Sequence, residues 1–296
     1  MISRFVPTAG AYNLRGTLAP TKSGRDPSIK VASGAWRRAS WTPDGAATLS
    51  LKRVDGGVDV TGWGPGAEWA VEQSPELLGM SDNLEDFTPP ASLAEVHRRN
   101  PGIRYCKTRR VLEVILRYIP AQRVTGKEAV QTYNHMCWKY GEPAPGPLDL
   151  RMPPDPTRLR HMTYPEAHLL GMDRRRAETM IECCRRAKRL EEASEMTSLD
   201  AQRRIRAIQG LGVWTAAHVR EVAWGDADAV HVGDYHLKNV VTYALTGRAR
   251  GTDEEMVELL EPFRPHRGRI VRLIAAAGIK APVFGPRQAI NPIKEW

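Results

Sequence analysis

The segment "IQGLGVWTAAHV" at 208–219 constrains the fold of this chain most, because Gly210 and Gly212 interrupt an otherwise helical pattern. The apolar positions that mark the two flanking helices are Leu199, Ile205 and Ile208 on one side and Ala216, Val219, Val222 and Ala223 on the other. Glycine permits a positive φ and lets a second backbone come close. The segment 198–224 therefore predicts two helices joined by a tight hairpin.

Such a hairpin can bind an anion. The first N–H groups of its second helix have no partner within the helix, and they lie at the positive end of the helix dipole. A phosphate binds to such an end without a charged side chain, and Thr215 in the first turn would add a hydroxyl donor. The alternative is a plain helical corner with a glycine C-cap, which explains one glycine well and the second poorly.

The charge balance also favours an anionic partner. Lys and Arg number 43 against 34 Asp and Glu, a net charge of +9, and the pI is about 9.6. Nucleic acid and an anionic membrane surface are the two classes of partner that this predicts. The longest apolar stretch, "VLEVILRYI", contains Glu113 and Arg117 and is too short to span a bilayer. The N-terminus lacks an apolar signal segment, so we expect a cytoplasmic protein without a membrane partner.

The cysteines and histidines do not predict a metal site. None of the four cysteines forms a C-x₂-C pair, and adjacent Cys183 and Cys184 would point to different faces of a helix. His231 and His236 lack a third ligand at metal spacing, so we interpret them as ordinary polar residues. Buried, reduced thiols and no bound metal are expected.

The sequence predicts an α+β protein. Residues 1–35 are rich in Gly, Pro and Ser and suggest a loose arm. In 36–91, "TLSLKRV" and "VDVTGW" alternate in period two around a "DGG" turn at 55–57, after an earlier turn at 43–45, which predicts a small antiparallel sheet. Residues 92–282 are helical, and 283–296 form a tail. Four capping boxes are predicted, at Ser92–Glu95, Thr125–Glu128, Thr163–Glu166 and Thr252–Glu255.

One predicted helix, at 173–190, has an apolar stripe and a basic face. The basic residues are Arg174, Arg175, Arg185, Arg186 and Arg189. This face is either simply solvated or in contact with phosphates.

Asp234 in "HVGDYHLKNVVTYAL" immediately precedes a helix that extends to about Leu245. An aspartate there is commonly an N-cap. The same position keeps the carboxylate ionised, which suits electrostatic or base chemistry at neutral pH. Both roles remain open from the residues alone.

Together, "IQGLGVWTA" and "HVGDY" about twenty residues later resemble the helix-hairpin-helix (HhH-GPD) DNA glycosylases of base-excision repair. The likeness is greatest to the bacterial 3-methyladenine DNA glycosylase II branch. The segment "ILRYIPAQRVTGKEA" is similar to the part of that family that fills the gap left by an extruded base, and "PFRPHRGRIVRLIAAAG" to its C-terminal helix. The resemblance covers roughly 36–282 and implies a sheet domain followed by two helical lobes.

By position, the resemblance implies a role for each candidate residue. Asp234 matches the catalytic aspartate, and Trp214 stands where bifunctional members carry a Schiff-base lysine. The implied contacts to DNA are Gly210, Gly212 and Thr215 at the hairpin and Gln122 and Arg123 at the wedge, and the implied base pocket contains Trp214, His218 and Ala275.

Three departures from the family pattern affect the wedge and its surroundings. The loop "GDADAVHVG" lacks the family's proline, Pro120 precedes the wedge, and Arg123 replaces a plain apolar wedge. Ala275 stands where relatives carry a tryptophan, so a wider pocket that admits bulkier adducts is expected.

The implied activity is release of alkylated purines from double-stranded DNA, leaving an abasic site. The resemblance implies a monomer near the nucleoid, with no cofactor apart from a monovalent cation on the hairpin carbonyls. Three alternatives stay open: a catalytically inactive DNA-binding protein, a glycosylase (or glycosylase/lyase) for a different damaged base, and a helical scaffold with a basic surface.

Overall fold

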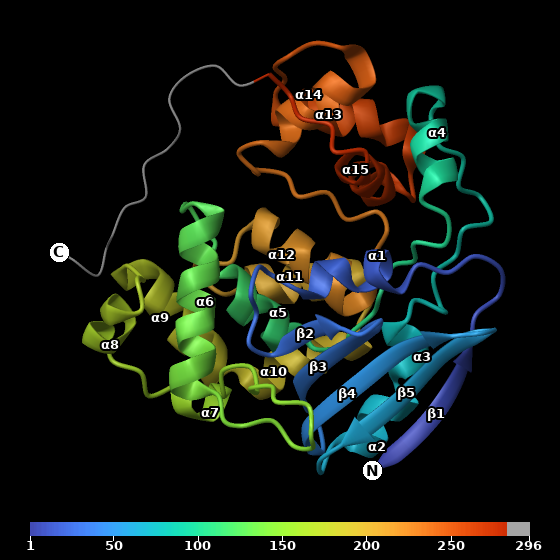
Figure 1. Cartoon of the computed structure of the whole chain (residues 1–296). Helices are drawn as coiled ribbons and strands as arrows, with labels where there is room; N and C mark the ends of the chain where they lie inside the picture. The colour runs from blue at the N-terminus through green and yellow to red at the C-terminus, as the bar shows by residue number, and fades with distance from the viewer. Residues whose placement is uncertain (283–296) are drawn as a thin grey trace.

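The N-terminal part of the chain folds into one antiparallel sheet with the strand order β1-β5-β4-β3-β2 (Figure 1). The computed structural model describes residues 1–282, so the predicted tail at 283–296 lies outside the described residues. The strands are β1 (Ile2–Pro7), β2 (Ile29–Ala32), β3 (Ala35–Thr42), β4 (Gly45–Val54) and β5 (Gly57–Trp63). Both predicted turns fall between consecutive strands, at 43–44 and 55–56, as the alternation indicated. Helices α2 (Ala67–Glu72) and α3 (Ser74–Leu77) follow, and α2 packs on strands β1, β4 and β5.

The first 35 residues differ from the predicted loose arm. Strand β1 pairs with β5 from Ile2 opposite Gly62 to Pro7 opposite Gly57, and β2 pairs with β3. Between them, α1 (Leu14–Leu18) places Leu18 in the sheet core. Asp26 is buried in an ion pair with Arg117 of the helical body. The apolar residues of this arm are isolated along the chain, so their pattern does not reveal strands that depend on partners far away in sequence.

The rest of the chain is helical, as predicted. The helices are α4 (Ala91–Arg99), α5 (Val111–Tyr118), α6 (Gly126–Tyr140), α7 (Pro156–Leu159), α8 (Tyr164–Leu169), α9 (Arg174–Arg185), α10 (Ala187–Glu191), α11 (Ser198–Arg206), α12 (Val213–Val219), α13 (Leu237–Thr246), α14 (Asp253–Leu260) and α15 (Arg267–Ala276). Short 3₁₀ turns cover Ala19–Thr21, Glu192–Glu195 and Glu261–Phe263, and a π-helical turn at Arg220–Trp224 continues α12.

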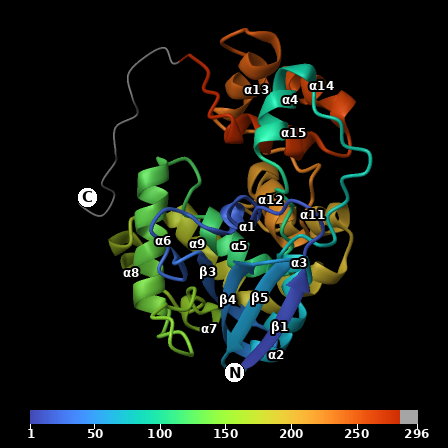
Figure 2. The same ribbon diagram turned by 45° about the vertical axis from the view of Figure 1, so that its right-hand side comes forward.

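The helices form two lobes with separate cores. The first lobe is built around α5, whose residues are almost all buried, and includes α6–α12. The second contains α4 and α13–α15, with Leu93, Val241, Met256 and Ile270 in its core. The second lobe stands at the top of both views, away from the sheet (Figures 1 and 2). The α+β prediction with two helical lobes is confirmed.

Most of the capping boxes predicted from the sequence are correct. The capping boxes at Thr125, Thr163 and Thr252 are all present. The box at Ser92 is wrong, because α4 already begins at Ala91 after Pro90, and Glu95 instead pairs with Arg98 and Arg99. The four cysteines are free and buried, and burial raises the pKa of Cys106 to about 11. Within residues 1–282, no helix is both long and apolar enough to cross a membrane.

Candidate active site

The predicted hairpin is present between α11 and α12, and its two glycines differ in backbone conformation and surroundings. Gly210 has a φ of +92°, and a Cβ there would lie 2.1 Å from Thr179 Oγ1. Gly212 has a φ of −88° in extended backbone, which any residue adopts, and nothing lies within 4 Å of its Cβ position. The expectation of a positive φ at both glycines is therefore wrong for Gly212. The protein itself requires Gly210, whereas Gly212 leaves open space at the exposed start of α12.

Gln122 joins the turn after α5 to this hairpin. Its side-chain Nε2 donates hydrogen bonds to Gly210 O and to Thr215 Oγ1, each at 3.0 Å. Thr215 is 1% exposed, so its hydroxyl faces Gln122 and not the surface. The contacts to DNA predicted for Gln122 and Thr215 differ from this arrangement, in which both side chains brace the hairpin from inside. The carbonyls of Gln209 and Gly210, where a monovalent cation was implied, accept hydrogen bonds from Thr179 and Gln122.

Arg123, the next residue, is exposed and has a φ of +57°. A positive φ is uncommon for a residue other than glycine, and such backbone strain gathers at functional sites. Gln122 ties this turn to the hairpin, while the side chain of Arg123 is exposed to solvent. Of the two residues predicted at the wedge, Arg123 is the one placed to reach a partner.

Asp234 lies at the end of the loop before α13, and each of its carboxylate oxygens has a separate contact. Oδ1 accepts hydrogen bonds from the backbone N–H groups of His236 and Leu237, both at 2.9 Å. Oδ2 accepts a hydrogen bond from Trp214 Nε1 at 3.2 Å. The N-cap role that the sequence left open is therefore present. It occupies one oxygen and directs the other toward α12.

Four aromatic side chains, here called the ring cluster, lie behind this carboxylate: Tyr118, Trp214, His218 and His231. The His218 ring is stacked between Tyr118, with centroids 3.9 Å apart, and His231, at 3.7 Å. Trp214 packs edge-on against His218 at 4.6 Å. Burial and the neighbouring His231 hold the pKa of His218 well below its ordinary value. The cluster is thus a set of packed rings next to one oxygen of the Asp234 carboxylate.

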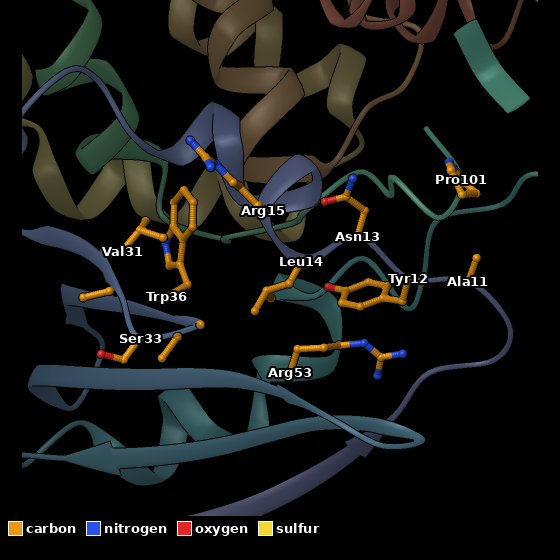
Figure 3. Close-up of a pocket in the computed structure, with 13 residues that line it drawn as sticks. Ala11, Tyr12, Asn13, Leu14, Arg15, Val31, Ser33, Trp36, Arg53 and Pro101 are labelled. Carbon is orange, nitrogen blue, oxygen red and sulfur yellow. The ribbon is translucent and has the colours of Figure 1, made fainter. Parts of the chain in front are cut away.

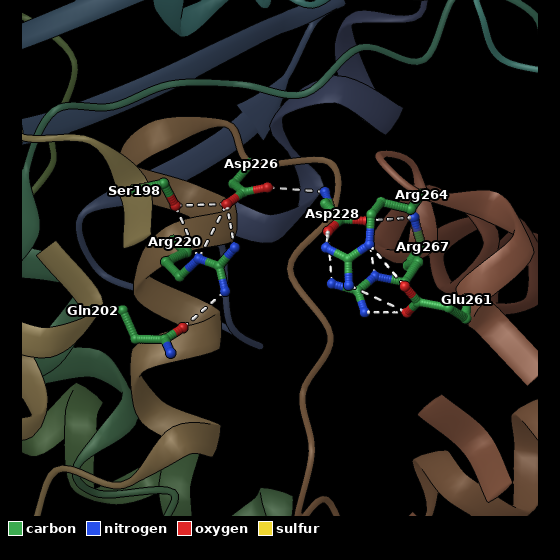
Figure 4. A network of polar contacts seen from close by, with 8 residues as sticks. All are labelled: Ser198, Gln202, Arg220, Asp226, Asp228, Glu261, Arg264 and Arg267. Atoms are coloured by element: carbon green, nitrogen blue, oxygen red, sulfur yellow. Dashed lines mark hydrogen bonds and ion pairs between the residues drawn. The ribbon is translucent and has the colours of Figure 1, made fainter. Parts of the chain in front are cut away.

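The loop that carries Asp234 is anchored to both helical lobes (Figure 4). Asp226 accepts hydrogen bonds from Ser198 Oγ at 2.5 Å and from Arg220 Nη2 at 2.6 Å, both in the first lobe. Asp228, two residues on, binds Arg267 Nη2 at 2.6 Å and Arg264 Nη1 at 3.2 Å, beside the second lobe. The N–H of Asp228 donates to Asp226 Oδ1 at 2.9 Å. Two adjacent ionic contacts therefore set the start of this loop.

Sequence reasoning missed Tyr118 and Glu221. Glu221 is buried in the π-helical turn, and its Oε2 lies 3.0 Å from His231 Nε2. Burial acts to raise the pKa of this carboxyl, but its interactions with His231 and Arg272 outweigh burial and lower it. The i, i+3 spacing of His218 and Glu221 was readable as one helix face. Nothing local connected that face with His231.

Stability should fall as the pH drops below about 6.5, the ordinary pKa of histidine. The unfolded chain then binds a proton at residue 218 that the folded protein, with its lowered pKa, does not accept. The free energy of unfolding therefore decreases by up to about 1.4 kcal/mol per pH unit from this residue. Urea titrations between pH 7.5 and 5.5 measure the slope.

The matched control for this pH slope is His218→Asn, which keeps a polar side chain but cannot be protonated in this range. In this variant, the slope of the unfolding free energy against pH should correspond to about one proton fewer than in wild type. His266 also has a lowered pKa, because of burial and of Arg269, and contributes to both proteins equally. Identical slopes in wild type and His218→Asn would contradict the assignment.

Ala275, which was predicted to line the base pocket, is exposed on α15. A cavity of about 740 Å³ lies between α1 and strands β2 and β3, lined by Tyr12, Arg15, Trp36 and Arg53 among others (Figure 3). None of the predicted site residues lines it. Its lining lacks a carboxylate, so it does not offer the chemistry that Asp234 does.

The basic face predicted on the 173–190 segment is exposed. Its five arginines all lie at the surface, while Ala177, Met180 and Cys184 on the opposite side of α9 are buried in the first lobe. Two of the five are partly neutralised, Arg174 by Glu178 at 3.8 Å and Arg186 by Glu182. A net positive surface therefore accompanies the hairpin in the same lobe.

The arrangement of the sheet, the two helical lobes and the hairpin is similar to that of solved DNA glycosylase structures. A 3-methyladenine DNA glycosylase from Archaeoglobus fulgidus superposes with a TM-score of 0.78 over 93% of this chain and 98% of its own, at 20% identity. An 8-oxoguanine glycosylase/lyase from Clostridium acetobutylicum, in complex with double-stranded DNA, gives 0.68 over 90% and 91%, at 13% identity. The Schizosaccharomyces pombe 3-methyladenine DNA glycosylase Mag1, in complex with abasic DNA, gives 0.54 over 72% and 100%, at 15% identity.

At the level of sequence, no protein-family model and no curated protein matches the chain. The similar structures include both 3-methyladenine glycosylases and glycosylase/lyases for 8-oxoguanine. At these identities the likeness establishes the fold. The choice of damaged base and the presence of lyase activity have to be argued from the residues of this chain.

Proposed function

We propose that this protein is a monofunctional DNA glycosylase of base-excision repair that extrudes and hydrolytically releases alkylated purines, leaving an abasic site. The observation that carries the proposal is the Asp234 carboxylate, with one oxygen fixed by the amides of His236 and Leu237 at the start of α13 and the other 3.2 Å from Trp214 Nε1. A base inside a duplex is inaccessible, so the nucleotide must leave the stack before reaction. In this proposal the hairpin holds the DNA backbone, the turn at Arg123 fills the gap left by the extruded nucleotide, and the carboxylate acts on the sugar.

The chemistry follows from where charge develops. Breaking the N-glycosidic bond builds positive charge on the sugar, and a carboxylate near C1′ stabilises it and can position or deprotonate water. An alkylated base is already cationic and leaves readily, so a strong general acid is dispensable. The aromatic faces of Trp214 and Tyr118, which pack edge-on against each other, attract such a cation.

Binding of double-stranded DNA is assigned to three surfaces of the first lobe. The open space at Gly212 allows a phosphate to approach the N–H groups that begin α12, whose helical run continues through the π-helical turn to Trp224. Arg123 reaches the duplex as the wedge, and the arginines of α9 supply non-specific attraction. The proposal takes the protein to act as a monomer near the nucleoid.

Base release from DNA is the test of the proposal. Methylated duplex DNA is incubated with the full chain and the released bases are identified by mass, beside duplexes that carry a bulky purine adduct and 8-oxoguanine. We expect release of 3-methyladenine-like bases and of the bulky adduct. Binding without release would support the alternative of an inactive DNA-binding protein, and preferential release of 8-oxoguanine would support the other-base alternative.

The tolerance for bulky adducts rests on Ala275, where similar proteins are expected to carry a tryptophan. Ala275→Trp should reduce release of the bulky adduct more than that of 3-methyladenine, because a large ring would fill the widened pocket. Equal rates for wild type and variant on the bulky duplex would remove residue 275 from the pocket. Because residue 275 is exposed on α15, the substitution should leave the packing of the core unchanged.

Strand cleavage is expected to be absent. Trp214 occupies the position at which a lysine would form a Schiff base, and an indole N–H cannot act as that nucleophile. Borohydride trapping on damaged duplex should give no covalent adduct, whereas hot alkali should cleave the same product at abasic sites. A trapped adduct, absent without borohydride, would overturn the monofunctional assignment.

A further inference from the structure

We propose that His218, Glu221 and His231 form a binding site for a divalent transition-metal ion such as Zn²⁺. The imidazole nitrogens and the carboxylate oxygen of these residues all lie within 4.8 Å of one another. They come from three places in the fold: α12, the π-helical turn and the loop before Asp234. This proposal does not rest on the proposed glycosylase function.

One donor atom of this group has no partner, and the other two pair with each other. Nδ1 of His218 is buried and has no hydrogen-bond partner, whereas Nε2 of His231 lies 3.0 Å from Glu221 Oε2. Buried polar atoms are nearly always hydrogen-bonded, so the His218 nitrogen requires an explanation. A cation placed between this nitrogen and the His231–Glu221 pair would use the lone pairs of all three side chains.

The chemical nature of the donors selects the class of ion. Two imidazoles and one carboxylate suit zinc and its neighbours, whereas Mg²⁺ and Ca²⁺ prefer oxygen ligands alone. A metal binds imidazole in its neutral form and a carboxylate in its ionised form, so binding should strengthen as the pH rises.

The geometry requires a small local change. Ligand atoms around tetrahedral zinc are about 3.3 Å apart, so the side chains must close by roughly 1.5 Å at most. The His218 and His231 rings, now 17° from parallel, must also rotate so that their nitrogens converge. The π-helical turn, a feature found often at functional sites, is what brings Glu221 into the group. An ion there would fix His231, three residues before Asp234, to α12.

The test is metal uptake by the full chain, stripped with a chelator and free of any affinity tag, and measured without DNA. Calorimetric titration with Zn²⁺ should give one equivalent bound and a raised melting temperature. Trp214 fluorescence should change during the titration, because its ring packs against His218 at 4.6 Å. Co²⁺ should give the visible absorption of a tetrahedral site.

Two variants remove ligands and one serves as a matched control. Glu221→Gln and His231→Ala should each weaken Zn²⁺ binding by at least about 10-fold. His236→Ala lies in the same loop, exposed and edge-on to Tyr235, and should bind like wild type. Circular dichroism verifies that each variant is folded, and the conservative Glu221→Gln covers the case in which His231→Ala is not.

Several outcomes would overturn the proposal. The proposal fails if wild type binds no Zn²⁺, since His231 then only pairs with Glu221. It also fails if Glu221→Gln and His231→Ala both bind as wild type does, since the ion then sits elsewhere. Because uptake is measured without DNA, failure here leaves the base-release test unaffected. A protein that binds Zn²⁺ but releases no base would reject the glycosylase proposal alone.

Discussion

Replacing Asp234 by asparagine is expected to reduce base release by at least about 100-fold while leaving the protein folded. The asparagine Oδ1 can still accept the two hydrogen bonds from the N–H groups of His236 and Leu237. It carries no negative charge to stabilise the sugar in the transition state. Single-turnover release from methylated DNA measures the loss, and urea titration measures stability.

A comparison with Asp234→Ala separates capping from chemistry. Alanine removes both the charge and the cap, so it should lose about 1 kcal/mol of stability as well as activity. Asparagine should lose activity alone. If Asp234→Asn released bases within a few-fold of the wild-type rate, the carboxylate would be only a helix cap and the proposed mechanism would fail.

The two hairpin glycines are expected to respond to valine in opposite ways. Gly210→Val should destabilise the fold by at least about 2 kcal/mol, because valine disfavours a positive φ and its Cβ would collide with Thr179. Gly212→Val should cost less than about 1 kcal/mol, since its backbone is extended and the space around it is open. The second variant should instead lose DNA affinity.

The loss at Gly212→Val should be about 10-fold, and similar for every duplex sequence, because a phosphate contact carries no sequence information. Fluorescence anisotropy with two unrelated duplexes, one undamaged, measures it at fixed salt concentration. Gly212→Ala, with a smaller side chain, should lie between wild type and valine. Unchanged affinity in a folded Gly212→Val protein would indicate that the hairpin is a plain helical corner.

The sequence predicted those features of the fold that depend on short-range patterns. Strand alternation around the turn at 55–57, the capping boxes at Thr125, Thr163 and Thr252, and the hairpin all follow from spacing over a few residues. Strand β1 was missed because its partner, β5, lies about fifty residues away in the chain. A short, mostly exposed edge strand contains too few apolar residues to reveal itself alone.

The sequence predicted individual residues of the candidate site, but it did not predict the contacts between residues that lie far apart in the chain. Asp234 and Trp214 were both selected from sequence, but their hydrogen bond joins residues twenty apart. The DNA contact predicted for Gln122 stays a prediction, while its hydrogen bond to Gly210, across 88 residues, was not foreseen. Glu221 was missed because nothing local in the sequence connects its helix face with His231, which lies ten residues further along in the loop.

The two ion pairs that anchor the loop before Asp234 also limit how far the two helical lobes can move relative to each other. Asp226 belongs to the first lobe through Arg220, and Asp228 to the second through Arg267, with a single residue between them. A span so short has almost no slack, since a residue reaches at most about 3.6 Å. The two lobes therefore cannot move apart at this point without breaking an ion pair, so the loop holds them at a nearly constant separation. Under the proposed function, a duplex would have to bend to fit a nearly fixed angle between the lobes, so the stiffness of the DNA would become part of what the protein selects.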